Sequence, residues 1–222
     1  ERSQPQARRG RDDGWVQIPS TAMSNDTVSL FLAMLAVVCL VFVVVAAVIA
    51  GVAATRGLGP GLAALRDAVS DAALPLAFAV AATCMLGSLY MSEVRHFPPC
   101  DLCWYQRIAM YPLAVILLVA VIRKEKAVWR YVLPVALIGA TISTYHYLHE
   151  RFPDTVSTAC SLEASCATLW IWHFHFLSIP AMAWVGYVTI STLMLIARSA
   201  LRRHAPDADI DDFDPDTQEV PA

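Results

Sequence analysis

Two cysteines three residues apart, Cys100 and Cys103, are the residues whose type and spacing most directly suggest chemistry. Pro98 and Pro99 come just before them, and proline is tolerated at the start of a helix but not in its interior. We therefore expect the pair in the first turn of a helix. Free backbone N–H groups and the helix dipole favour an anion there, and a thiolate is such an anion. The pattern predicts thiol–disulfide exchange.

Arg107 follows Cys103 by four residues and Cys100 by seven, so the three side chains are expected on one face of that helix. Long apolar segments indicate that the helix lies in a membrane, where an arginine is costly unless it has a function or a partner. Arg107 could hold a thiolate or polarise the carbonyl of a bound oxidant. The alternative is that its side chain extends to the lipid headgroups and takes no part in chemistry.

A second pair, Cys160 and Cys166, encloses the short loop Ser161–Ser165. Closing so short a loop contributes little entropy, so stabilisation is a poor reason for a disulfide there. Exposed disulfides are the more oxidising ones, which favours an exchangeable pair, with a structural loop disulfide as the alternative. The remaining two cysteines, Cys39 and Cys84, lie within apolar segments and are expected to be packing residues.

Five histidines raise the question of a metal site: His96, His146, His149, His173 and His175. His146 and His149 are expected on one helix face, and zinc is conceivable because cysteines lie near the same surface. Zinc ligands usually form a compact set of four, however, and a membrane helix intervenes. We therefore expect no metal, and we expect the histidine rings to be polar tips at the membrane interface.

Long segments without Asp, Glu, Lys or Arg are the elements that must position these residues. Of the 222 residues, 57% are hydrophobic and only 16% are charged. A membrane-spanning helix needs about 20 apolar residues. We expect five of them, over residues 28–52, 72–92, 100–122, 129–148 and 180–198. The first apolar run, Val28–Gly51, is too long for a signal-peptide core of roughly 7–15 residues and is expected to remain as a membrane helix.

Two further segments are expected at the membrane surface. Leu62, Leu65 and Val69 lie on one face of a short amphipathic piece that precedes the second helix. The stretch Ala167–Leu177 is apolar and aromatic, which is typical of the headgroup level.

Basic residues in the short connections predict the orientation of the helices. The loop after the third helix and the end of the fifth are rich in Lys and Arg, so both are expected in the cytoplasm. Both cysteine pairs then lie on the extracytoplasmic side, where disulfides persist. Five spans also place the N-terminal tail outside, although it carries four arginines. The small net charge of −3 is uninformative about nucleic acid, but the sequence has no basic stripe interleaved with aromatic residues, so no nucleic-acid partner is expected.

The chain is thus expected to have four parts. These are a polar tail at 1–26, an extra transmembrane helix with a cytoplasmic linker at 27–71, a four-helix membrane domain at 72–198, and an acidic cytoplasmic tail at 199–222.

The segment Cys100–Ile108, read as CDLCWYQRI and running on to Met110-Tyr111-Pro112, closely resembles the signature of the DsbB/BdbC family of thiol:quinone oxidoreductases. The second cysteine pair, followed by an aromatic stretch and Ser178–Ala183, resembles the BdbC branch. The resemblance covers roughly residues 72–198. It implies an all-α membrane protein with a four-helix transmembrane bundle of DsbB type, to which the first helix is an extra N-terminal transmembrane helix.

The resemblance implies an electron relay in the bacterial cell (inner) membrane. A DsbA-like thioredoxin-fold partner would be reoxidised by Cys160–Cys166, with Cys160 forming the mixed disulfide. Electrons would then pass to Cys100–Cys103, with Cys100 exchanging with Cys166 and Cys103 facing a quinone, either ubiquinone or menaquinone. Arg107 matches the family's quinone-proximal arginine. The relay would support disulfide formation in exported proteins.

Two alternatives stay open. A quinone reductase resembling vitamin K epoxide reductase also uses a CxxC pair and a loop pair, but its CxxC comes late in the chain and here it comes first. The other alternative is a non-catalytic membrane subunit with structural disulfides. It predicts that Cys-to-Ser changes reduce stability and leave no catalytic defect.

Overall fold

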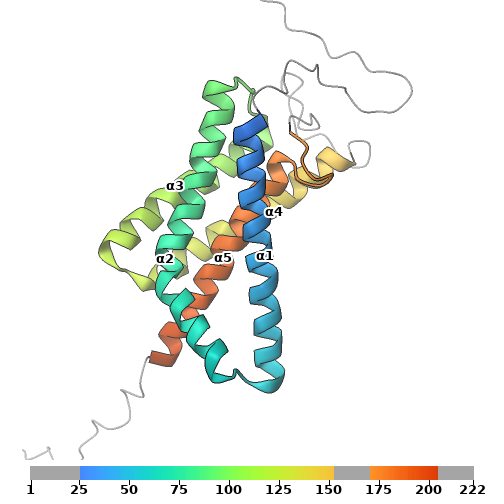
Figure 1. Cartoon of the computed structure of the whole chain (residues 1–222). Coiled ribbons are helices and arrows are strands. Elements are labelled where there is room, and N and C mark those ends of the chain that lie inside the picture. Colours follow the sequence, from blue (N-terminus) through green and yellow to red (C-terminus); the bar gives the residue numbers. More distant parts are fainter. Residues whose placement is uncertain (1–25, 153–170, 205–222) are drawn as a thin grey trace, which may run out of the picture.

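The structure, a computed structural model, describes residues 26–152 and 171–204. These residues form long helices joined by short turns, and one isolated β-bridge joins His173 to Leu177. Figure 1 shows the helices as one bundle. In chain order the elements are α1 (Asp26–Arg56), α2 (Pro60–Leu89), the π-helical turn η2 (Tyr90–Val94), α3 (Asp101–Arg123), the 3₁₀ turn η3 (Lys126–Val128), α4 (Trp129–Arg151) and α5 (Ile179–His204).

Five helices of the described ranges are long and apolar enough to cross a membrane. A helix suits a bilayer because it satisfies its own backbone N–H and C=O groups. The five predicted spans are therefore confirmed as helices, with ends within a few residues of those expected except at the start of α2 and the end of α5. The chain is an all-α, multi-pass membrane protein.

The second helix begins earlier than predicted. Pro60 occupies its first turn after the extended residue Gly59, and the helix then continues without a break to Leu89. The amphipathic piece expected around Leu62 is thus the first part of α2 and not a separate element. No helix-breaking residue separates that piece from the apolar segment, and Pro75 is accommodated inside the helix.

Helix α5 is the central element of the bundle. It packs against α1, α2 and α4, while α2 also contacts α3 and α3 contacts α4. Figure 1 shows α5, in orange, running between the other helices with the blue α1 beside it. The main core is formed largely by small and aliphatic side chains, including Ala77, Leu113, Val132 and Ile190. Small residues allow helices to approach closely, which is the main source of packing between membrane helices.

The closest approach in the bundle joins α4 to α5. Gly139 lies directly against the ring of Tyr187, and a Cβ atom at position 139 would overlap that ring. Tyr187 is fully buried, and its hydroxyl donates to the backbone carbonyl of Gln106 at 2.6 Å. One side chain on α5 therefore links α4 to α3, just below the start of α3.

The two ends of the bundle differ in chemistry. At one end Asp67 pairs with Arg203 at 3.2 Å, and Asp71 pairs with Lys126 at 3.2 Å. The predicted basic connections thus gather at this end. The cysteine pair and the end of α4 lie at the opposite end, where α1 also begins, since Ser29 and the ring of His173 are hydrogen-bonded at 3.2 Å.

Candidate active site

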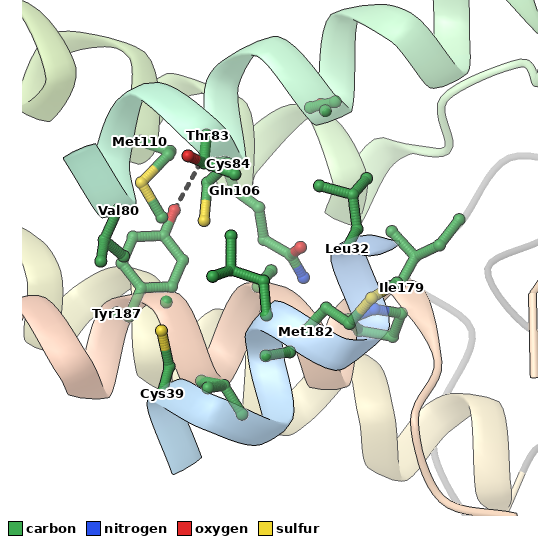
Figure 2. Close-up of a pocket in the computed structure, with 18 of the residues that line it drawn as sticks. Leu32, Cys39, Val80, Thr83, Cys84, Gln106, Met110, Ile179, Met182 and Tyr187 are labelled. Carbon is green, nitrogen blue, oxygen red and sulfur yellow. Dashed lines mark hydrogen bonds between the residues drawn. The ribbon is translucent and has the colours of Figure 1, made fainter. Parts of the chain in front are cut away.

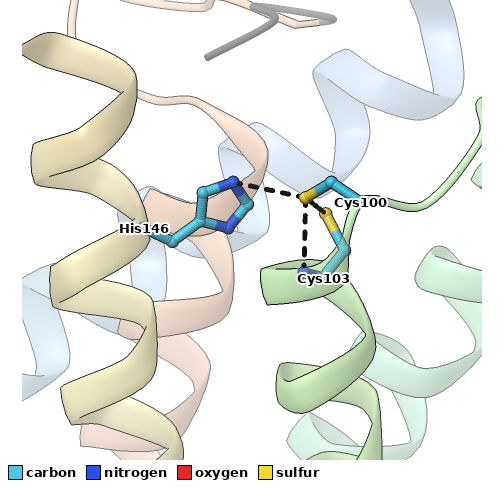
Figure 3. A group of neighbouring side chains, drawn as sticks. All are labelled: Cys100, Cys103 and His146. Atoms are coloured by element: carbon cyan, nitrogen blue, oxygen red, sulfur yellow. Dashed lines mark hydrogen bonds between the residues drawn. The ribbon is translucent and has the colours of Figure 1, made fainter. Parts of the chain in front are cut away.

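Cys100 caps the amino terminus of α3, as the sequence predicts. Its backbone is extended, and its Sγ atom accepts a hydrogen bond from the backbone N–H of Cys103 at 3.4 Å. The Sγ atoms of Cys100 and Cys103 lie 2.8 Å apart (Figure 3), and no disulfide joins them in this structure. The two sulfurs are thus close enough for a disulfide to join them with little rearrangement.

His146, on α4, is the third member of this group. Its Nε2 atom lies 3.7 Å from Sγ of Cys100 (Figure 3). Its Nδ1 atom lies 3.0 Å from the amide nitrogen of Gln106. An amide nitrogen only donates, so Nδ1 accepts and the ring proton sits on Nε2, directed at the sulfur. The histidine is therefore held by Gln106 in the tautomer that stabilises a thiolate.

These contacts lower the pKa of Cys100 well below the ordinary thiol value. The largest contribution is the hydrogen bond with the Cys103 thiol, and His146 adds to it. Burial of Cys100 opposes both, because it penalises the charged form. Cys100 is only 5% exposed, so its thiolate is stabilised by neighbours and not by water.

The histidine prediction is wrong for two of the five residues. His146 and His149 share a helix face as expected, but both are buried and neither is a polar tip at an interface. Glu150, one turn after His146, is buried as well. His146, Gln106 and Glu150 were not among the predicted site residues, although the four-residue spacing of His146 and Glu150 was a usable signal for two polar groups on one inward face.

Arg107 lies on the same face of α3 as Cys103, and both line one cavity. Its Nη2 atom donates to the backbone carbonyl of Ser88 on α2 at 3.1 Å, and its guanidinium stacks 5.3 Å from the ring of Trp104. The side chain is therefore held inside the bundle and does not simply extend to the headgroups. A guanidinium has five N–H donors, and the contact with Ser88 uses one of them.

The cavity beside the cysteines has a volume of about 510 Å³. Its wall is mostly aliphatic and aromatic, as Figure 2 shows for residues of four helices. The polar groups lie where α3 begins: Cys100, Cys103, Gln106, Arg107, His146 and Glu150 all line it. Ligand pockets of this size, apolar with a few convergent polar groups, bind small organic molecules.

The geometry of the cysteine–histidine group bears on metal binding. The ligand atoms of Cys100, Cys103 and His146 lie within 4.8 Å of one another, so the three could hold an ion. Two sulfurs on one tetrahedral zinc, each at about 2.3 Å, would be about 3.8 Å apart. The observed 2.8 Å between the two sulfurs is about 1 Å shorter than that zinc geometry requires. That the chain holds no metal stays a prediction.

The other cysteines are placed as follows. Cys160 and Cys166 lie outside the described residues, so their pairing and exchange stay predictions. Cys39 on α1 and Cys84 on α2 pack among apolar residues as predicted, and in addition both line the cavity.

Comparison with known proteins agrees with the motif. The sequence model of the family described as "Disulfide bond formation protein DsbB" matches residues 70–197. Disulfide bond formation protein C of Bacillus subtilis (strain 168) is 44% identical over 120 residues, which are 54% of this chain and 87% of that protein. No solved structure shows a significant match.

Two more distant relatives extend the comparison. Probable disulfide formation protein C 1 of Bacillus cereus (strain ATCC 10987 / NRS 248) is 40% identical over 133 residues, 59% of this chain and 95% of the relative. A probable disulfide formation protein of Coxiella burnetii (strain Dugway 5J108-111) is 35% identical over 126 residues, 56% of this chain and 86% of the relative. With more than half of its length matched by the family and a free CxxC pair at the head of α3, the chain belongs to the DsbB family of disulfide bond formation proteins.

Proposed function

We propose that the chain is a membrane thiol:quinone oxidoreductase that reoxidises a DsbA-like thioredoxin-fold partner and so supports disulfide formation in exported proteins. The observation that carries the proposal is the position of the Cys100–Cys103 pair. The pair lies at the polar end of a mostly apolar cavity, where Cys100 contacts His146 and where Gln106 and Arg107 also line the wall.

The exchange steps balance in electrons and protons. The partner's dithiol is oxidised to a disulfide while the Cys160–Cys166 disulfide is reduced to two thiols, with Cys160 forming the mixed disulfide. Cys166 then attacks Cys100, and the Cys100–Cys103 disulfide opens to release the Cys103 thiolate. When Cys160 closes the Cys160–Cys166 disulfide again, Cys100 leaves as a thiolate.

The site is suited to that last step. A thiol with a lower pKa leaves faster in thiol–disulfide exchange. The Cys103 contact and the ring of His146 stabilise the Cys100 thiolate, so its pKa is lowered. The helix amino terminus contributes the N–H of Cys103 as a further donor. These groups act on Cys100, and we propose that Cys103, which lines the cavity beside Arg107, is the cysteine that reacts with the quinone.

The distribution of polar and apolar groups in the cavity fits a quinone. Its polar groups lie beside Cys103, and the rest of its wall is apolar. Oε2 of Glu150 is buried there without a hydrogen-bond partner among the described residues. A bound quinone, ubiquinone or menaquinone, would supply an acceptor for two electrons and two protons. Arg107 and Glu150 would hold its polar ring, and the aliphatic wall would hold its tail.

We place the protein in the bacterial cell membrane with both cysteine pairs on the extracytoplasmic side and the C-terminus in the cytoplasm. The support is the gathering of basic residues at the end of the bundle away from Cys100, since cytoplasmic loops carry an excess of Lys and Arg. That end holds Arg123, Lys124, Lys126, Arg202 and Arg203.

The test is quinone reduction by the purified full chain with a reduced DsbA-like protein as electron donor. Cys103→Ser is expected to accumulate a mixed disulfide with the partner and to lose quinone reduction by at least a hundredfold. Cys160→Ser is expected to lose both the mixed disulfide with the partner and quinone reduction. If Cys103→Ser reduces quinone at the rate of the unmodified chain, the relay is refuted. If the Cys-to-Ser variants are less stable but equally active, the cysteines are structural.

A further inference from the structure

Helix α1 contributes to the cavity although it lies outside the family match. The match begins at residue 70, whereas α1 ends at Arg56. Six α1 residues line the cavity opposite α2: Leu32, Leu35, Ala36, Val38, Cys39 and Phe42. Part of the wall of the family's redox site is thus built from a segment that the family model does not include.

The inner face of α1 is held firmly against the bundle. Ala33 and Ala36 are buried and form a cluster with Leu177 and Val185 of the α5 region. Near its start, Leu32 approaches Gly87 of α2 so closely that a Cβ atom on that glycine would lie 3.1 Å from a Leu32 methyl carbon. These contacts fix which side of α1 faces the cavity.

Farther from the cysteines the two helices enclose space instead of packing together. Cys39 on α1 and Cys84 on α2 carry their sulfurs into the cavity from these two sides, as Figure 2 shows. Phe42 on α1 and Leu76 on α2 extend the apolar lining toward the opposite end of the bundle. The cavity is therefore elongated, with a polar head at Cys103 and an apolar extension along α1.

We propose that α1 is the side wall of the quinone site and binds the apolar tail of the quinone, thereby setting which tails the site accepts. This inference rests on the proposed function and adds a binding element to it. The polar head of the cavity is supplied by the start of α3 and the end of α4, which both lie within the family match. The tail region is supplied jointly by α1, α2 and α5, so α1 gives it a wall that the family model does not include.

Residues on the outward face of α1 make it possible to distinguish a role of the helix in quinone binding from that of a simple membrane anchor. Phe31, Met34, Val41 and Val45 are all exposed and none of them lines the cavity. Leu35 and Cys39 alternate with them on the inner side. Neighbouring positions on one helix therefore provide matched pairs, one inside the proposed site and one outside it.

The first test uses Cys39 as a native reporter and needs no turnover. The purified full chain in detergent is treated with a lipid-soluble maleimide, with and without ubiquinone, and labelling of each cysteine is followed by mass spectrometry. Ubiquinone is expected to slow labelling of Cys39 at least fivefold. A cysteine on the outward face, introduced as Val45→Cys, is expected to label at the same rate in both samples. Equal labelling of Cys39 with and without ubiquinone would overturn the proposal.

The second test fills the cavity from the α1 side. Leu35→Trp is expected to raise the KM for quinone about tenfold and to leave the exchange of disulfides with the partner unchanged. Met34→Trp, one residue away on the exposed face, is expected to change neither. Equal effects of the two variants would contradict the proposal. A chain that reduces no quinone at all would refute the proposed function, whereas normal quinone reduction without protection of Cys39 would refute only the role of α1.

Discussion

The Nε2 atom of His146 lies 3.7 Å from the Sγ atom of Cys100, although 46 residues separate the two in the chain. The ring is oriented by the amide of Gln106. This contact joins the end of α4 to the head of α3. The reactivity of Cys100 therefore depends on α4, a helix that carries no cysteine.

The first prediction concerns pH. Because the pKa of Cys100 is lowered, its thiolate persists in the folded protein below the pH near 8.5 where an ordinary thiol gains its proton. The alkylation rate of Cys100 by iodoacetamide in the reduced protein should therefore change little between pH 9 and pH 7. An ordinary thiol slows roughly twentyfold over that range.

The same lowered pKa predicts how the contribution of Cys100 to folding stability depends on pH. A thiol with a lowered pKa stabilises the folded state above its unfolded pKa, and this stabilisation is lost as the pH falls through the folded pKa.

In the alkylation experiment, tandem mass spectrometry of the labelled peptide distinguishes Cys100 from Cys103, and the denatured protein serves as the control. A rate for Cys100 that falls in parallel with that of the denatured chain would show that the thiolate is not stabilised.

The second prediction separates His146 from its neighbour. His146→Ala removes one of the contacts that lower the pKa of Cys100, so its alkylation rate at pH 7 should fall several-fold and its pH profile should shift upward. His149→Ala is the matched control, because His149 is also buried on α4 but lies outside the thiol group. An equal shift in both variants would indicate general disruption of α4.

The third prediction concerns Arg107. Arg107→Ala removes the guanidinium that is held by the carbonyl of Ser88 beside the cavity. We expect the KM for quinone to rise at least tenfold and the exchange of disulfides with the partner to stay within about twofold. Arg123→Ala, at the opposite end of the same helix, should leave both unchanged. Equal loss of both reactions in Arg107→Ala would point to misfolding.

The sequence was informative wherever a property depends on near neighbours in the chain. Long apolar segments predicted the helices, and the two prolines before Cys100 predicted that it would lie at a helix start. The spacing of Arg107 correctly placed it on the same face as Cys103.

Properties that depend on packing between helices were not predictable. The contact of His146 with Cys100 exists only because α4 packs on α3. The proposed role of α1 in quinone binding was not predictable for a related reason. The helix is apolar on every side, so its residue pattern does not show which face turns inward.

The fourth prediction tests the packing that supports the site. Gly139→Ala places a methyl group into the ring of Tyr187, which is fully buried and cannot move aside freely. Overpacking of this kind costs about 1–3 kcal/mol. Displacement of Tyr187 should also weaken its hydrogen bond to the carbonyl of Gln106, the residue that orients His146. We therefore expect a lower free energy of unfolding in a denaturant titration in detergent, together with slower alkylation of Cys100 at pH 7.

Two companion variants separate these effects. Gly51→Ala introduces the same methyl group into α1 where no atom lies within 4 Å, so it should not reduce stability. Tyr187→Phe keeps the ring but removes the hydroxyl, which should cost about 1 kcal/mol. If Tyr187→Phe slows alkylation of Cys100 as Gly139→Ala does, the hydrogen bond to Gln106 is the link between core packing and thiol reactivity. If only Gly139→Ala slows it, the link is the displacement of the ring against α4. If neither variant changes the rate, the orientation of His146 does not depend on Tyr187.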